Sequence, residues 1–204
     1  VCHGRGVTAI VFDRHGELVL EHTAGATGDA PAWSPSVQEG VGSVSKLPAT
    51  ATFMAAVIDT SKGSLDSELS DILPEVFEVE GAHGGNATVR MLLSHTAGFN
   101  DEVYRGQTDC FVRSPYHANH CRAAELAPTL DSCLTQVSRM ELQAQPGEQF
   151  VYSNNAFLIL AAVTERLTGM SFEAALQRYI AEPLGMNSTT YKCPDSGSTA
   201  ELPF

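Results

Sequence analysis

The order of the apolar segments constrains the fold of this chain most, because a strand hairpin comes first and helices follow it. Residues 6–12 form an apolar run that predicts a buried strand, and residues 18–22 predict the strand that returns after a turn. Apolar residues at helical spacing then predict helices at 43–60, 89–93, 130–142, 156–167 and 171–180. We therefore expect strands and helices to combine in one α/β fold.

Three of the later segments carry local signals. The helix at 43–60 is expected to present one apolar face, made of Leu47, Ala51, Met54, Ala55 and Ile58. Ser171 is predicted to cap the helix at 171–180, because a serine oxygen can accept from N–H groups of the first turn. Residues 100–127 show no regular pattern, so they predict a long ordered loop.

Composition narrows the possible partners. The 204 residues are 43% hydrophobic and 18% charged, which is typical of a folded globular chain. The formal net charge of −12 disfavours binding to nucleic acid and to anionic membrane surfaces. No apolar run is long enough to span a bilayer. We expect no nucleic acid and no membrane among the partners.

Two sequons favour a secreted glycoprotein. Asn86 and Asn187 each begin an Asn-X-Ser/Thr acceptor pattern for N-glycosylation. The chain starts at Val1, which is expected either after removal of a leader or at a chosen fragment boundary. The cysteines are Cys2, Cys110, Cys121, Cys133 and Cys193.

No two cysteines have the Cys-X-X-Cys spacing of zinc or redox sites. Cys110, Cys121 and Cys133 lie in a polar stretch without a regular pattern, where a disulfide would restrain a long loop. Cys110–Cys121 is the shortest-range pairing. Because the chain has five cysteines, an odd number, at least one thiol is unpaired or paired outside the chain.

Ser43 and Lys46 form the first chemically suggestive pair. If Ser43 opens a helix, Lys46 lies one turn later on the same face and can reach the serine oxygen. The positive end of the helix dipole favours a developing alkoxide there, and a lysine among apolar neighbours can act as a base. The alternative is that Ser43 only caps the helix and Lys46 is a solvated charge.

Tyr152 and Asn154 form the second suggestive pair. The Tyr152 hydroxyl could shuttle a proton to or from Ser43, and the Asn154 amide could hold a substrate or fix Lys46. The alternative is that Asn154 caps the following helix and Tyr152 is a half-buried core residue.

Four segments together resemble the serine β-lactamase-like family, which includes class C β-lactamases, D,D-peptidases and related esterases. They match its nucleophile segment, its "LLxHTSG" signature with Ala97 in place of Ser, its "PG-x-x-F-x-YSN" segment and its "PLGM" turn. These matches stand at 41–47, 92–99, 146–155 and 182–186. The similarity runs from about Gly6 to Tyr191.

The resemblance implies a role for each matching residue. Ser43 would be the nucleophile, Lys46 and Tyr152 the acid/base pair, and Asn154 a contact to substrate or to Lys46. The Ser43 N–H would form half of an oxyanion hole. His95 falls in a structural turn signature, and no GxSxG elbow surrounds Ser43, so a Ser-His-Asp triad is not expected. His117 and His120 have a loose metal-like spacing but no convincing third ligand, so they are interpreted as loop residues.

The resemblance also implies a two-lobe fold that is incomplete in this chain. An antiparallel sheet flanked by helices would use residues 1–64 and 152–204, and residues 65–151 would form a mostly helical lobe. The family's late strands and its third motif, KTG or HxG, have no counterpart in the sequence. We therefore expect a C-terminal fragment of the same precursor as a second chain; a truncated chain is the alternative.

The expected activity is serine hydrolysis through an acyl-enzyme, with no metal and no organic cofactor. The substrate would be a small molecule with an ester, amide or β-lactam carbonyl. Two alternatives remain: an acyltransferase of the same family, and a catalytically silent relative used for binding or assembly. The sequence does not choose among the substrates.

Overall fold

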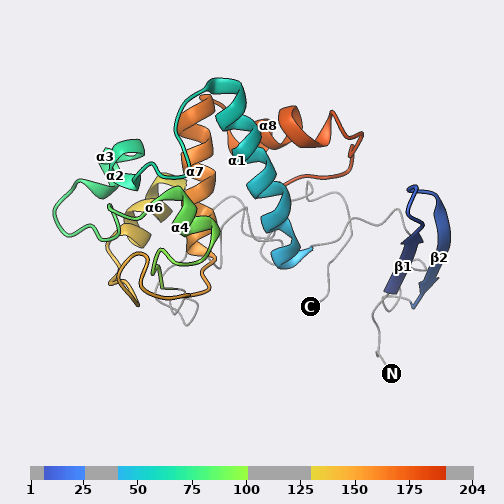
Figure 1. Cartoon of the computed structure of the whole chain (residues 1–204), viewed down its shortest axis with the longest axis horizontal. Coiled ribbons are helices and arrows are strands. Elements are labelled where there is room, and N and C mark those ends of the chain that lie inside the picture. Colours follow the sequence, from blue (N-terminus) through green and yellow to red (C-terminus); the bar gives the residue numbers. More distant parts are fainter. Residues whose placement is uncertain (1–6, 26–40, 101–129, 192–204) are drawn as a thin grey trace. The chain divides into compact units, whose positions relative to one another are not determined.

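The computed structural model describes residues 7–25, 41–100 and 130–191 (Figure 1). The chain divides into two compact units, one made of residues 1–40 with 195–204 and the other of residues 41–194. Cys110, Cys121, His117, His120 and nearly all of the predicted loop at 100–127 lie outside the described residues. Within the described residues, no helix has the length and apolarity that crossing a bilayer requires.

The N-terminal unit contains the predicted hairpin. Strand β1 (Val7–Phe12) pairs antiparallel with β2 (Leu18–Ala24), and Ile10 lies opposite Glu21. In the turn, the Asp13 carboxylate accepts from the N–H groups of His15 and Glu17 at 2.7 and 2.9 Å. The hairpin prediction is confirmed.

The predicted burial of the first strand is not achieved within its own unit. Ile10 is 45% exposed and Phe12 60% exposed, and Leu20 on the other strand is 50% exposed. An apolar run predicts burial only where other elements cover the strand. Within the described part of this unit, β1 and β2 pair only with each other, so their side chains remain exposed.

The second unit is helical. A 3₁₀ turn (Gly42–Ser45) leads into α1 (Lys46–Thr60), and short helices follow as α2 (Leu69–Ile72), α3 (Pro74–Phe77) and α4 (Val89–Leu93). After the undescribed segment come α6 (Leu130–Ser138), α7 (Asn155–Thr168), α8 (Phe172–Leu176) and a π-helical turn (Gln177–Ala181).

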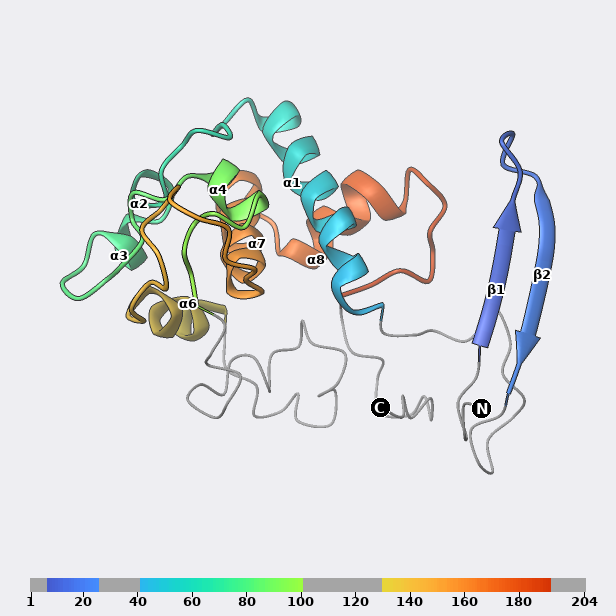
Figure 2. The same ribbon diagram turned by 60° about the horizontal axis from the view of Figure 1, so that its bottom comes forward.

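Helix α7 forms the centre of this unit. It contacts α1 and α8 on one side and α4 and α6 on the other (Figures 1 and 2). Its Ile159, Leu160 and Val163 side chains have no exposed surface. These residues share one hydrophobic core with Phe53 of α1 and Leu92 of α4. The apolar spacing that predicted this helix therefore reflects burial around most of its circumference.

The apolar face predicted for α1 is not the face that is most deeply buried. Leu47 and Ile58 are 73% and 76% exposed, whereas Ala49, Phe53 and Ala56 are buried. Helix α1 packs against α7, and its buried residues are Ala49, Thr52, Phe53 and Ala56. The sequence of α1 is apolar on more than one face, so spacing alone did not identify the face that meets α7.

Helix ends agree with the sequence signals in part. Ser171 caps α8, and its Oγ accepts from the Ala174 N–H at 3.2 Å. Gly169 ends α7 in the left-handed conformation with φ of 70°. The helix expected at 130–142 already ends at Ser138, and the one expected at 171–180 changes to a π-helical turn after Leu176.

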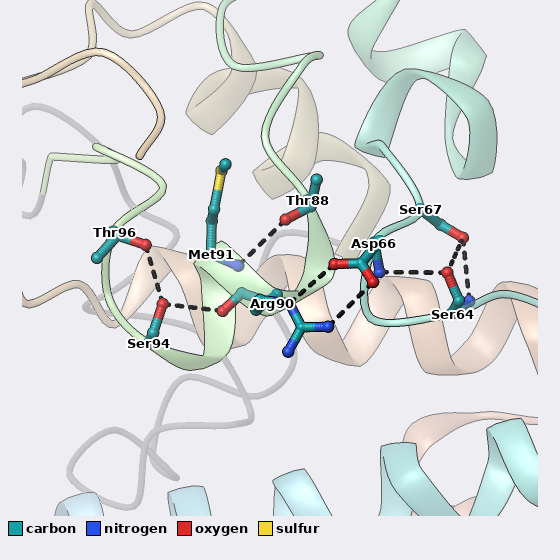
Figure 3. A network of polar contacts seen from close by, with 8 residues as sticks. All are labelled: Ser64, Asp66, Ser67, Thr88, Arg90, Met91, Ser94 and Thr96. Carbon is teal, nitrogen blue, oxygen red and sulfur yellow. Dashed lines mark hydrogen bonds and ion pairs between the residues drawn. The ribbon is translucent and has the colours of Figure 1, made fainter. Parts of the chain in front are cut away.

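A surface network fixes α4 to the loop that precedes α2 (Figure 3). Arg90 donates to both carboxylate oxygens of Asp66, at 2.8 and 3.0 Å, and holds the pKa of Asp66 below its ordinary value. Thr88 caps the start of α4, and at its end Ser94 donates to the Arg90 carbonyl. The end of α4 leads directly into the site.

The two predicted lobes, 1–64 with 152–204 and 65–151, stay a prediction, because the compact unit 41–194 contains parts of both. Asn86 and Asn187 are exposed, as glycan attachment requires, and their glycosylation stays a prediction.

Candidate active site

Ser43 lies in the 3₁₀ turn that precedes α1 and is exposed. The turn begins at Gly42, whose φ of 52° is a conformation that side chains disfavour. The Oγ of Ser45 donates to the Gly42 carbonyl at 2.7 Å, so a side-chain hydrogen bond joins the last residue of the turn to the first. Ser43 is not the N-cap of this turn or of α1, since Val41 and Ser45 hold those positions. The interpretation of Ser43 as a helix cap is therefore wrong.

Lys46 points from the first turn of α1 to two polar atoms. Its Nζ donates to Ser43 Oγ at 3.0 Å and to Asn154 Oδ1 at 2.6 Å. The ammonium also lies 5.0 Å from the centre of the Tyr152 ring and 5.3 Å from that of Phe157. Lys46 is half-buried and is thus not the solvated helix charge of the alternative interpretation.

Tyr152 and Asn154 approach the same serine from the segment before α7. The Tyr152 hydroxyl is 2.6 Å from Ser43 Oγ, with either oxygen as donor. Asn154 stands at the N-cap position of α7, but its side chain makes no capping hydrogen bond and accepts from Lys46 instead. The structure thus brings together all four predicted residues, although the pair Ser43 and Lys46 is more than 100 positions from the pair Tyr152 and Asn154 in the sequence.

His95 contacts the segment around Tyr152 through hydrogen bonds and ring stacking. Its Nδ1 accepts from the Ser153 N–H at 3.1 Å, and its carbonyl accepts from the Val151 N–H at 2.7 Å. The His95 ring stacks on the Tyr152 ring, with 4.5 Å between the ring centres. His95 has a φ of 57°, in the left-handed region that residues other than glycine seldom adopt. The structural role expected of His95 is consistent with these contacts.

Gly98 explains why the segments at 92–99 and 146–155 occur together. A Cβ at Gly98 would lie 2.0 Å from the Ala144 carbonyl oxygen, so only glycine fits there. Backbone hydrogen bonds run alongside this contact, from Gln143 N to the Gly98 carbonyl and from Gly147 N to the Thr96 carbonyl, each at 2.8 Å. The His95 turn and the Tyr152 segment are therefore one joined structure.

The arrangement can activate a hydroxyl. Ser43 Oγ contacts Lys46 Nζ and Tyr152 Oη at once, so a proton leaving the serine has two candidate acceptors within hydrogen-bond distance: the lysine nitrogen in its neutral amine form and the phenol oxygen. Among the described residues, the ion pairs are Arg90–Asp66, Arg166–Glu75 and Arg178–Asp59, and Lys46 takes part in none of them. The described residues also contain no cluster of three or more His, Cys, Asp or Glu side chains suited to a metal ion.

The structure thus joins the serine, lysine and tyrosine that the sequence singled out in one hydrogen-bonded group. The sequence model described as Beta-lactamase matches residues 3–201, and the chain therefore belongs to the beta-lactamase family.

Curated relatives carry different activities in their names. The chain is 29% identical over 151 residues to the D-alanyl-D-alanine-carboxypeptidase/endopeptidase AmpH of Escherichia coli K12, covering 74% of this chain and 36% of AmpH. It is 30% identical over 187 residues to the esterase EstB of Burkholderia gladioli, covering 89% of this chain and 45% of EstB. The chain thus spans less than half the length of these relatives.

A solved structure confirms the β-lactamase-like fold. EstCE1, described as a hydrolase with promiscuous acyltransferase activity, is similar with a TM-score of 0.65 and 25% identity over 88% of this chain and 46% of its own.

Proposed function

We propose that this protein is a serine hydrolase that acts through an acyl-enzyme on Ser43. One observation carries the proposal: Ser43 Oγ lies within hydrogen-bond distance of both Lys46 Nζ and Tyr152 Oη. A hydroxyl held by a potential base and a potential proton relay is the arrangement that nucleophilic catalysis needs.

The reaction has two steps. Ser43 Oγ attacks a carbonyl carbon, its proton passes to the Lys46–Tyr152 pair, and that proton leaves with the departing alcohol or amine. Water then attacks the acyl-serine, releases the acid and returns a proton to Ser43. Asn154 holds Lys46 toward the serine throughout. The proposed substrates are small molecules with an ester, amide or β-lactam carbonyl, supported by relatives named as an esterase and a carboxypeptidase/endopeptidase.

Acyl transfer to an alcohol or amine is the second candidate, favoured by the acyltransferase activity in the description of EstCE1. It differs only in the acceptor of the second step. A silent family member used for binding is the remaining alternative, and the intact polar contacts of Ser43 argue against it.

The test is turnover of p-nitrophenyl acetate by the full-length protein, alone and with an added alcohol. Ser43→Ala is expected to abolish turnover, whereas Ser64→Ala, a matched change at an exposed serine in the loop after α1, retains it. An ester product formed with the alcohol would establish the transferase. Equal turnover by Ser43→Ala and the native protein would refute the proposal.

We also propose that the site is completed by polypeptide beyond these residues, supplied as a second chain from the same precursor, and that the protein is secreted. The matches cover only 36% of the length of AmpH and 45% of the length of EstB, which supports the first part. The exposed sequons support the second part. Electrophoresis of the native protein under reducing conditions, before and after glycan removal, tests both. A single unshifted band would contradict them.

A further inference from the structure

Tyr191, the last described residue, contacts the 3₁₀ turn Gly42–Ser45, which carries Ser43 and is called the nucleophile turn below. Its hydroxyl donates to the carbonyl of Ser45, which stands between Ser43 and Lys46. Its ring packs edge-on against Phe172, with 5.0 Å between the ring centres, beside Ala49 of α1. The hydroxyl and the ring thus contact the same short segment where the 3₁₀ turn becomes α1.

Glu173 fixes the backbone that carries Tyr191. Its carboxylate accepts from the Tyr191 N–H at 2.7 Å and from the Thr190 hydroxyl at 2.8 Å. Gln177 donates to the same carboxylate at 2.9 Å and to the Thr189 carbonyl at 2.7 Å. Residues 189–191 are therefore held on α8 by contacts that do not involve the nucleophile turn.

We propose that Tyr191 is a positioning residue that sets the direction of Lys46 relative to Ser43. The inference rests on the proposed function, because it concerns the same serine. The Ser45 carbonyl belongs to the peptide unit joined to Lys46, so a fixed carbonyl also fixes where α1 begins. Small displacements of catalytic groups reduce rates strongly, and a misplacement of about 1 Å can cost roughly 10²-fold.

The hydroxyl remains a donor under ordinary conditions. Burial raises the pKa of Tyr191 to about 12. The phenol is therefore protonated throughout the neutral range, and this contact adds no titration of its own to the pH profile of the enzyme.

The chain offers a matched control in Tyr179. Its hydroxyl donates to the Asp59 carboxylate at 2.7 Å, near the opposite end of α1. Tyr191→Phe and Tyr179→Phe each remove one oxygen and one hydrogen bond to the α1 region, and both keep the ring. Only Tyr191→Phe changes a contact beside Ser43.

The experiment uses full-length protein and measures how fast a fluorophosphonate labels it, followed by intact mass. Tyr191→Phe is expected to slow labelling about tenfold while leaving the melting temperature equal to that of Tyr179→Phe. With p-nitrophenyl acetate, kcat is expected to fall and KM to stay unchanged. Equal labelling rates for the native protein and Tyr191→Phe, or equal slowing in both variants, would overturn the inference.

Hydrogen exchange separates this inference from the proposed function. The amides of residues 42–46 are expected to exchange faster in Tyr191→Phe than in the native protein and in Tyr179→Phe. If the native protein is not labelled at all, the proposed function fails and exchange alone decides. Faster exchange confined to Tyr191→Phe then retains the positioning contact, and unchanged exchange refutes it.

Discussion

The Ser43 turn and the N-terminal hairpin are both short, exposed segments, but they are held in different ways. The turn receives side-chain contacts from Lys46, from Tyr152 and, through Ser45, from Tyr191. Within the described residues of its unit, the hairpin has its own ladder and the local bonds of its turn. The comparison teaches that polar contacts from distant segments can fix an exposed site that has little apolar burial.

The largest expected effect concerns the polar contacts of the turn. Lys46→Ala removes one hydrogen-bond partner of Ser43 and one of Asn154, and ester turnover is expected to fall roughly 10²–10⁴-fold. Leu47→Ala, at the next and 73% exposed position, is the control and should retain activity. A Lys46→Ala enzyme with normal kcat would show that the contacts around Ser43 do not activate it.

Substitutions of two phenylalanines, one in the helical core and one in the hairpin, compare how much apolar burial stabilises each region. Phe53→Ala empties a fully buried position in the core and is expected to lower the free energy of unfolding by about 3–5 kcal/mol. Phe12→Ala, at a position 60% exposed in the hairpin, is expected to change it by about 0.5 kcal/mol or less. Denaturant unfolding measures both. A large loss with Phe12→Ala would mean that the hairpin is covered in solution.

The joint between the His95 turn and the Tyr152 segment gives the next effect. Gly98→Ala places a Cβ against the Ala144 carbonyl and requires a positive φ, so the free energy of unfolding should fall by about 2–3 kcal/mol. Gly81→Ala also has a positive φ but open space around its Cβ, so a smaller loss is expected. Equal losses would show that φ, and not the close approach, determines the cost.

The smallest effect appears only at high pH. Tyr191 has an ordinary pKa of 10 that burial raises to about 12, so the folded state binds its proton more tightly than the unfolded state. This contribution is complete below pH 10 and is lost as the pH rises toward 12. Native protein should therefore lose more stability than Tyr191→Phe over that interval, by up to about 2 kcal/mol. Parallel stability curves for the two proteins would contradict the raised pKa.

The sequence predicted the local features well. The hairpin, the helix around Leu160 and the cap at Ser171 follow from residue types and spacing alone, and the structure confirms them. Ser43, Lys46, Tyr152 and Asn154 were also proposed from the sequence, because the matching segments keep recognisable spacing. The structure brings these four side chains together, and their catalytic roles stay a prediction.

Contacts between distant segments could not be predicted in this way. Leu47 and Phe12 are apolar, and only the packing of other elements decides that they are exposed. The contact of Tyr191 with the Ser45 carbonyl and the stacking of His95 on Tyr152 depend on the folded path of the backbone. Tyr191 comes a few residues after the "PLGM" segment. This position near a recognisable motif was the sequence signal that could have drawn attention to it.

The most direct test of the central claim is to expose the full-length protein to a fluorophosphonate and locate the adduct by peptide mass spectrometry. An activated Ser43 predicts one covalent adduct on the peptide that contains it, with none in Ser43→Ala or after heat denaturation. An adduct on another residue, or no adduct on the folded protein, would contradict the account that Lys46 and Tyr152 make Ser43 a nucleophile.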